Sequence, residues 1–216
     1  MKYEDLDQHA KNKVRLEWEV GQVDTGWWEH VYDDAVTCAR CLGIEIGERS
    51  SRTIGGRPVN NPDIAFSGFW SQGDGCSFGG WLRMAETYDA TTDVKAHAPQ
   101  DEELLRLAGV AEELHAQFQA ILVADRLSDE EPLYPELTPQ TAFVIKGESH
   151  RGFSTRIEYN DGLPEDFEKA ADELLENFAR WIYNQLEAEH THLTSDESFK
   201  DWIDDAPDFD EEENLE

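Results

Sequence analysis

Two cysteines spaced three residues apart could act as metal ligands. Cys38 and Cys41 fall within a predicted helix, where residues three apart share a face, so both thiols could reach one ion. A structural zinc site needs four ligands, and the sequence offers no second such pair; His30 and Cys76 are the other candidates. A redox pair would lie at a helix N-terminus, but these cysteines lie near the C-terminus. We therefore expect reduced, buried thiols, with no metal site and no cofactor.

A second candidate is a run of turn-forming residues that follows a tryptophan. This motif loop comprises Trp70, Ser71, Gln72, Gly73, Asp74 and Gly75. In a functional interpretation, the glycines let backbone amides approach a ligand, and Trp70 or Trp81 offers a stacking face. In a structural interpretation, the glycines permit positive φ angles and Asp74 caps its own turn. The loop lacks the Gly-Lys-Ser/Thr sequence of a phosphate-binding loop.

Histidines give no catalytic signature. The nearest cluster is the run 189–192, Glu-His-Thr-His, which lies at a predicted helix end, where cations are favoured as caps. The sequence contains neither an H-E-x-x-H helix nor a recognisable Ser, His and Asp order. We therefore lean toward a protein that is not an enzyme.

The excess of acidic residues restricts the classes of partner. The chain has 216 residues, with 48 Asp and Glu against 18 Lys and Arg, and a formal net charge of −30. Nucleic acids and anionic membranes bind clustered cations, so we expect neither as a direct partner. Three interpretations of the acidity stay open: adaptation to high salt, solubility through repulsion, or carboxylates that imitate nucleic-acid phosphates. The acidic N-terminus is unlike a secretory signal, and we expect a cytoplasmic protein.

Two predicted helices carry acidic residues on their solvent sides. Steps of three or four residues separate carboxylates by about 4.5–6 Å along a helix, against about 3.4 Å between phosphates of one DNA strand. Imitation of DNA would therefore need two columns of carboxylates. The candidate partner-binding residues are Glu165, Glu168, Asp172, Glu173 and Glu176 on one helix, and Asp101, Glu102, Glu103, Glu112 and Glu113 on the other.

Hydrophobic spacing predicts the elements that must position these residues. Apolar residues at helical spacing predict helices over about 3–18, 27–42, 101–124 and 164–189, with a short helix near Trp202. Alternating segments predict two hairpins, 63–70 with 76–84 and 141–148 with 153–159, and residues 48–62 form an exposed loop or a weak hairpin. We expect one α+β domain over 1–203, a four-stranded, mainly antiparallel sheet packed with four to five helices, and an acidic tail over 204–216.

One stretch resembles a known group of proteins. The run Phe66–Phe78, FSGFWSQGDGCSF, is similar to a motif of uncharacterised proteins encoded by bacteriophages and related mobile elements. The runs Leu186–His190 and Leu193–Glu197 resemble the same family's C-terminal helical segment. The resemblance implies a viral or mobile-element setting and no particular chemistry.

These observations lead to three hypotheses. The first is an accessory protein that inhibits a basic host protein, of the nucleic-acid-binding, defence type, through its carboxylates. The second is a small ligand-binding or enzymatic domain that uses the loop at Ser71–Cys76, with acidity reflecting salt. The third is an antitoxin-like partner of a basic toxin. A single elongated acidic face would favour the first, and a concave pocket at the motif loop would favour the second.

Overall fold

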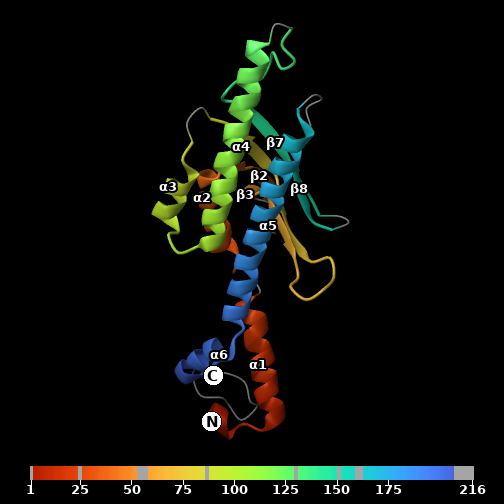
Figure 1. The fold of residues 1–216 in the computed structure, drawn as a ribbon. Coiled ribbons are helices and arrows are strands. Elements are labelled where there is room, and N and C mark those ends of the chain that lie inside the picture. Colours follow the sequence, from red (N-terminus) through yellow and green to blue (C-terminus); the bar gives the residue numbers. More distant parts are fainter. Residues whose placement is uncertain are drawn as a thin grey trace. The chain divides into compact units, whose positions relative to one another are not determined.

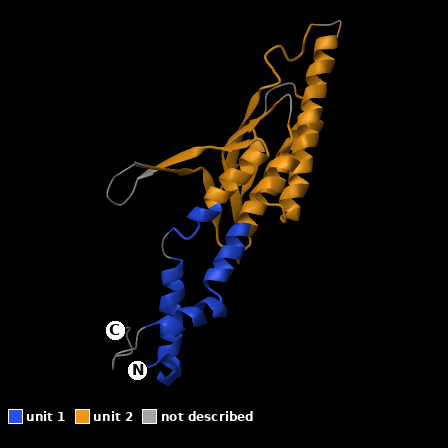
Figure 2. Cartoon of the chain, turned by 90° about the vertical axis from the view of Figure 1, so that its left-hand side faces the viewer, with its two compact units in different colours: residues 1–31, 185–216 blue, residues 32–184 orange. Residues whose placement is uncertain are grey.

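The protein is represented by a computed structural model that describes residues 2–23, 26–52, 58–85, 88–128, 131–149, 152–158 and 163–206, except for the side chains of 51, 52 and 58. Contacts divide the chain into two compact units (Figure 2), a larger one over 32–184 and a smaller one over 1–31 and 185–216. The described helices are η1 (Tyr3–Asp5), α1 (Gln8–Gln22), α2 (Glu29–Cys41), α3 (Ala90–His97), α4 (Glu102–Leu127), α5 (Glu165–Leu193) and α6 (Asp196–Asp205). Most of the predicted acidic tail, residues 207–216, lies outside the described residues.

The larger unit contains one four-stranded sheet and two two-stranded sheets, all antiparallel (Figure 1). Its strands are β1 (Ile44–Ile46), β2 (Glu48–Arg52), β3 (Pro58–Pro62), β4 (Ile64–Ser67), β5 (Gly75–Phe78), β6 (Gly80–Arg83), β7 (Ala142–Glu148) and β8 (Ser154–Ile157). The four-stranded sheet has the order β1-β6-β7-β8, while β2 pairs with β3 and β4 with β5. The predicted α+β class with a four-stranded antiparallel sheet is confirmed.

The sheet is not assembled from the two predicted hairpins. The segment predicted as one strand over 76–84 is divided, because β5 pairs with β4 whereas β6 enters the four-stranded sheet between β1 and β7. The edge strand β1 replaces the first strand of the predicted hairpin. The hairpin of β7 and β8 is confirmed, and residues 48–62 include the exposed hairpin of β2 and β3.

Three linking residues organise these strand pairs. Gly47 lies between β1 and β2, Asp63 between β3 and β4, and Gly79 between β5 and β6. Their backbones form a closed ring of hydrogen bonds: Gly47 N–H donates to Gly79 O (2.8 Å), Gly79 N–H to Asp63 O (2.9 Å) and Asp63 N–H to Gly47 O (2.8 Å). The three antiparallel pairs therefore meet at one point, which we call the Gly47–Asp63–Gly79 junction.

Helices α4 and α5 lie side by side across the four-stranded sheet (Figure 1). Phe118 of α4, Phe143 of β7 and Phe167 of α5 are buried together, with ring centroids 5.5–5.7 Å apart. These helices confirm the two long predicted ones and extend three to four residues further. The structure adds α3, which apolar spacing did not predict. No helix within the described ranges has the length and apolar character needed to cross a bilayer.

The smaller unit has its own apolar cluster. Leu6 and, on α1, Ala10, Val14 and Trp18 are buried together with Phe199 of α6. This cluster joins the two ends of the chain. Burial of apolar surface is the main stabilising contribution available to so small a unit.

Candidate functional site

One carboxylate determines the conformation of the motif loop between β4 and β5. Asp74 Oδ2 accepts hydrogen bonds from the backbone N–H groups of Trp70 (3.0 Å) and Ser71 (2.6 Å). The Asp74 N–H donates to the Ser71 carbonyl oxygen (3.1 Å). Gly73 has a φ angle of 106°, which favours glycine, and Gln72 is exposed. Turn chemistry therefore accounts for Gly73 and Asp74, and the Asp74 carboxylate is already engaged with the loop.

Aromatic rings attach this loop to α5. Phe69 packs against Tyr183 (ring centroids 5.4 Å apart) and against Phe66 (6.0 Å), and the Tyr183 hydroxyl donates to the Gly68 carbonyl oxygen (3.0 Å). The Trp70 and Phe69 rings form a T-shaped pair with centroids 6.0 Å apart, but Trp70 is 81% exposed. The loop therefore presents a large apolar side chain to solvent from a backbone that is held in place.

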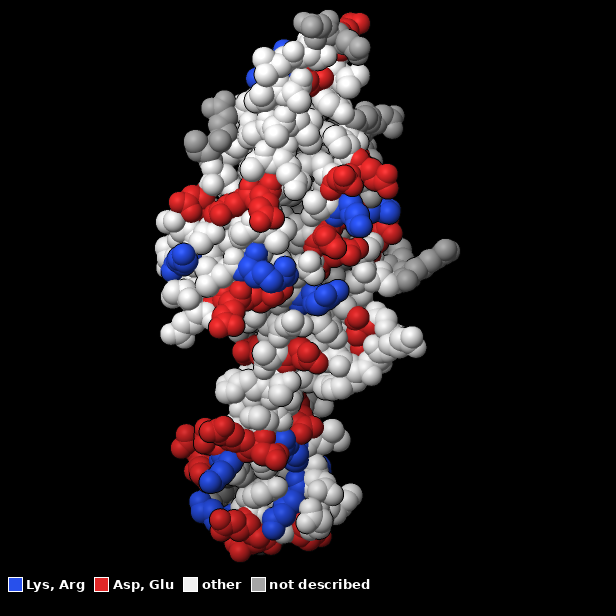
Figure 3. Space-filling model, viewed as in Figure 1, with Lys and Arg blue, Asp and Glu red and all other residues white. Residues whose placement is uncertain are grey.

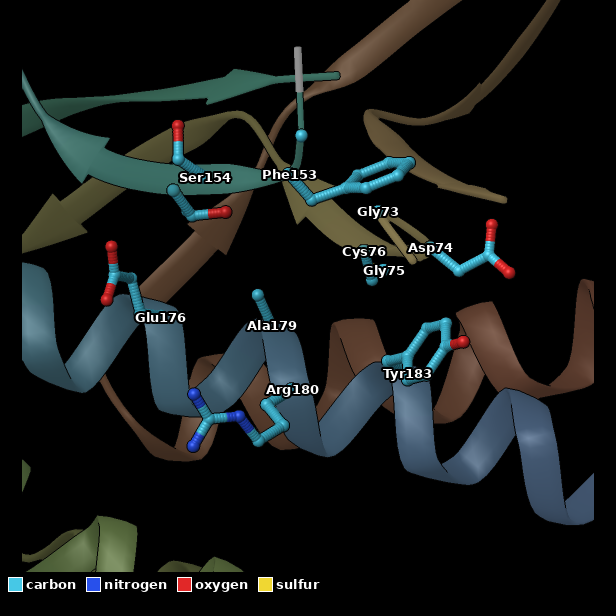
Figure 4. A pocket seen from close by; sticks show the side chains of 12 residues that line it. Gly73, Asp74, Gly75, Cys76, Phe153, Ser154, Glu176, Ala179, Arg180 and Tyr183 are labelled. Atoms are coloured by element: carbon cyan, nitrogen blue, oxygen red, sulfur yellow. The ribbon is translucent and has the colours of Figure 1, made fainter. Parts of the chain in front are cut away.

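A cleft of about 320 Å³ lies beside the loop (Figure 4). One wall is formed by the loop and β5, a second by the start of β8, and a third by α5. Position 75 favours glycine, because a Cβ there would lie 3.1 Å from the Phe153 ring. The lining residues are Gly73, Asp74, Gly75, Cys76, Gly152, Phe153, Ser154, Thr155, Glu176, Ala179, Arg180 and Tyr183.

The cleft contains a thiol, hydroxyl groups and charged side chains. Burial raises the pKa of the Cys76 thiol to about 12, so this thiol is protonated at neutral pH and is a poor nucleophile. The Thr155 hydroxyl accepts a hydrogen bond from the Phe78 N–H (3.3 Å). Glu176 and Arg180, one turn apart on α5, are both exposed and bring opposite charges to the cleft. A small polar molecule that carries both charges would complement this pair.

Two of the predicted acidic residues at α4 bind backbone amides. Asp101 caps α4 by accepting from the Leu104 N–H (2.8 Å), and its second oxygen accepts from the Trp181 indole N–H (2.8 Å). Glu112 accepts from the Thr91 N–H at the start of α3 (2.7 Å). Both carboxylates therefore connect elements of the fold.

Two more of these acids are also engaged. Glu103 forms two hydrogen bonds with Arg106 (2.9 and 2.7 Å), and this ion pair lowers the pKa of Glu103. On α5, Asp172 accepts from the Ile157 N–H of β8 (2.9 Å), which interrupts the predicted column. Glu168 is partly buried. Glu103 stays exposed in its pair with Arg106, and the other exposed predicted acids are Glu102, Glu113, Glu165, Glu173 and Glu176.

The visible surface does not present a continuous acidic band. Figure 3 shows red and blue side chains interspersed on the visible face of each unit. Pairs on the sheet follow the same pattern, because Lys146 lies 2.5 Å from Glu158 and Arg156 lies 2.9 Å from Glu148. Among the predicted acids, Glu103 is paired with a cation, Arg106.

Most residues of the cleft were not predicted as site residues, among them Phe153, Arg180 and Tyr183. On α5, Glu176, Arg180 and Tyr183 follow at steps of four and three, so they share one helix face. That spacing could have suggested a common site. It could not show that the motif loop faces them, because the loop lies about a hundred residues earlier in the chain.

One cluster in the larger unit could hold a metal ion. Asp34 and Cys38 of α2 and His97 of α3 each bring one ligand atom, and these atoms lie within 4.8 Å of one another. The sequence had suggested a different pair, Cys38 and Cys41.

The fold and the site define a mixed α+β protein in which a hairpin loop borders a polar cleft. The chain belongs to the family described as a domain of unknown function, DUF8835, whose model matches residues 27–196. That range contains the motif loop, every residue that lines the cleft, and the Asp34, Cys38 and His97 cluster. No curated protein and no solved structure matches the chain.

Proposed function

We propose that this chain is a non-enzymatic interaction protein that binds a basic protein, with Trp70 as the anchor of its binding surface. The observation that carries the proposal is the 81% exposure of Trp70 on a loop whose backbone is held by Asp74. Tryptophan is among the residues that contribute most to protein–protein affinity. Few other large apolar side chains in the described residues are as exposed.

The fixed loop lowers the cost of binding. A mobile loop would lose conformational freedom when a partner docks, and that loss weakens affinity. Here two backbone N–H groups are already bound to Asp74, and Phe69 and Tyr183 hold the base of the loop. Trp70 is therefore presented with its backbone ordered before the partner arrives.

The charge of the chain indicates the chemistry of the partner. A formal net charge of −30 attracts basic proteins over a distance and accelerates their encounter. Proteins that bind nucleic acid form the class that this charge favours. The resemblance to phage and mobile-element proteins supports a partner in a host cytoplasm. The exposed carboxylates would steer such a partner, while Trp70 would supply the desolvated contact.

Affinity purification with matched tryptophan variants tests this function. We expect wild type to retain a basic protein that Trp70→Ala loses, because the variant removes the anchor. With the purified partner, Trp70→Ala should raise Kd about 30-fold, the effect of losing a residue worth about 2 kcal/mol. Double-stranded DNA should compete if the partner uses its nucleic-acid site.

Trp81→Ala is the matched control, since Trp81 is 40% exposed on β6 and lies outside the motif loop. It should bind the partner with the affinity of wild type. Equal losses for both variants would contradict a specific anchor. Retention of every captured protein by Trp70→Ala would contradict the proposed function.

A second candidate function is the binding of a small polar ligand in the cleft. The observation that favours it is the pair Glu176 and Arg180, which complements the two charges of a free amino acid. Arg180→Gln should then abolish the rise in Tm that a free amino acid produces, while Trp70→Ala should preserve it. The two variants therefore separate the two functions, and Lys169→Gln, an exposed site elsewhere on α5, controls for the lost charge.

A further inference from the structure

Three side chains from two helices converge at one edge of the larger unit. Asp34 and Cys38 lie one turn apart on α2, and His97 is the last residue of α3. His97 Nε2 lies 2.8 Å from Asp34 Oδ1, and Cys38 Sγ lies 3.9 Å from Asp34 Oδ2. Asp34 therefore stands between the other two groups, with one oxygen directed toward each.

These separations are close to those between the ligand atoms of a tetrahedral ion. Zinc binds sulfur at about 2.3 Å and nitrogen or oxygen at about 2.0–2.2 Å, which places two ligand atoms about 3.3–3.6 Å apart. The observed separations of 2.8 and 3.9 Å lie on either side of that range. The side chains of His97 and Asp34 are 36% and 52% exposed, so rotation about their bonds can supply the adjustment. Cys38 is fully buried and supplies a fixed ligand.

The donor set selects the class of metal. A thiolate, an imidazole and a carboxylate suit zinc and similar transition metals, whereas magnesium and calcium prefer oxygen ligands alone. We propose that Asp34, Cys38 and His97 bind one zinc-like divalent ion, with the fourth position taken by water or an exogenous ligand. This site is independent of the proposed function at Trp70. It also revises the expectation that the chain has no metal site.

The surroundings of Cys38 affect how binding proceeds. Burial, followed by the charge of Asp34, raises the pKa of the Cys38 thiol to about 12. The ion must therefore displace the thiol proton, so that the S–H bond breaks, a sulfur–metal bond forms and the proton passes to solvent. Asp101 adds a further negative charge that acts on Cys38 and favours a cation there.

A bound ion would join α2 to α3. The first turn of α3 is held by Glu112 of α4, which binds the Thr91 N–H. Its last turn carries His97, whose contact with Asp34 connects it to α2. A metal ion in this position would add bonds between the two helices. Binding to the folded state alone raises Tm by mass action.

Titration of the full-length protein with cobalt tests the site. Cobalt is the probe because a bound thiolate produces a charge-transfer absorption band, which a carboxylate cluster does not. In the presence of excess magnesium, we expect this band to saturate at one equivalent of cobalt. Addition of zinc should abolish the band, and zinc should raise Tm. Cys38→Ala should abolish the band. His97→Gln and Asp34→Asn should each weaken metal affinity at least about tenfold. Loss of a residue that only supports a ligand already weakens affinity by about that much, and loss of a ligand should cost more.

Two matched variants control for general effects. Cys41→Ser changes a half-buried thiol one turn away whose sulfur lies 3.5 Å from the Thr37 carbonyl oxygen, and Asp33→Asn removes an exposed charge next to Asp34. Both should keep the affinity of wild type.

His97→Gln leaves the buried core unchanged, so it tests the site even if Cys38→Ala unfolds. Absence of the thiolate band in wild type would overturn the proposal and leave an Asp34–His97 hydrogen bond only. Suppression of binding by magnesium would overturn it too, because it would indicate diffuse attraction to an acidic surface.

Discussion

His115 of α4 is a titratable residue in the core of the larger unit. It is 3% exposed and stacks on Tyr88, with ring centroids 3.8 Å apart and an interplanar angle of 10°. Burial lowers the pKa of its imidazole to about 4. The charged form is therefore disfavoured in the folded state relative to the unfolded chain.

Stability should consequently fall as the pH is lowered from 6.5 to about 4, since the unfolded chain binds a proton at His115 over this range and the folded chain does not. The loss should approach about 3 kcal/mol. Chemical denaturation at several pH values measures it. His115→Phe, which keeps a ring against Tyr88, should show a smaller fall than wild type. His9→Gln, at an exposed site of α1, should behave as wild type. Equal falls for wild type and His115→Phe would contradict this role.

Carboxylates show what single residues reveal before the structure is known. A helix start at Asp101 is evident from the acidic run that follows it, because acids favour the first turn of a helix. Its second bond, to the Trp181 indole, joins residues 80 positions apart and has no local signal. The same holds for Glu112 and Asp172, which bind amides of other elements. Spacing on a helix predicts that a carboxylate lies on the surface. It does not predict whether the carboxylate already accepts a hydrogen bond from another element.

Among the elements, the division between β5 and β6 depends on two adjacent glycines. Gly79 leaves no room for a side chain because the Asp63 carboxylate lies against it. Gly80 has a φ angle of 153°, and a Cβ there would overlap the Glu45 carbonyl oxygen of β1. This close approach lets β6 pair with β1 immediately after the chain leaves β5.

Gly80→Ala should therefore destabilise the protein by about 2 kcal/mol or more, because the backbone contact must open. Gly109→Ala is the matched control: it lies within α4, and a Cβ there meets nothing within 4 Å. That variant should stabilise the protein by about 0.5–1 kcal/mol through the better helix propensity of alanine. Urea unfolding with an unchanged m value measures both effects. A wild-type midpoint for Gly80→Ala would show that the contact relaxes without cost.

The long helices were predictable, whereas the short elements α3 and β1 were not. The apolar stripes of α4 and α5 extend over many turns, so their spacing predicts a helix. The eight residues of α3 bury only Ala90 and Val94, and β1 has three residues, so neither gives a periodic signal. The motif loop was predictable from its turn residues. The cleft was not, because Phe153 and Arg180 reach it from distant parts of the chain.

At the level of the whole molecule, charge opposes folding. A formal net charge of −30 brings like charges together in the folded state, and the self-repulsion disfavours compact structure. Exposed ion pairs such as Arg106 with Glu103 offset little of it, because such pairs contribute about 0–1 kcal/mol each. Mean hydropathy is −0.67, yet both units bury apolar clusters. The exterior of the chain is therefore acidic around a well-packed interior.

Sodium chloride should stabilise this protein. Raising its concentration from about 0.1 M to about 1 M shortens the screening length from about 10 Å to about 3 Å. This screening weakens the long-range repulsion between carboxylates more than it weakens the attraction within ion pairs in direct contact. We expect Tm to rise by several degrees in thermal unfolding, and binding of the basic partner to weaken over the same range. An uncharged osmolyte added at equal osmolality serves as the control. A Tm that falls with salt would mean that ion pairs outweigh repulsion.

The Gly47–Asp63–Gly79 junction has a consequence for how the larger unit opens. Each of the three residues both donates and accepts one bond of the ring, so separation of any one strand pair leaves the other two pairs with an unmatched amide or carbonyl. We therefore expect the three strand pairs, β1 with β6, β2 with β3, and β4 with β5, to open cooperatively. Opening of one of these strand pairs should therefore also loosen the backbone ring that joins the other two.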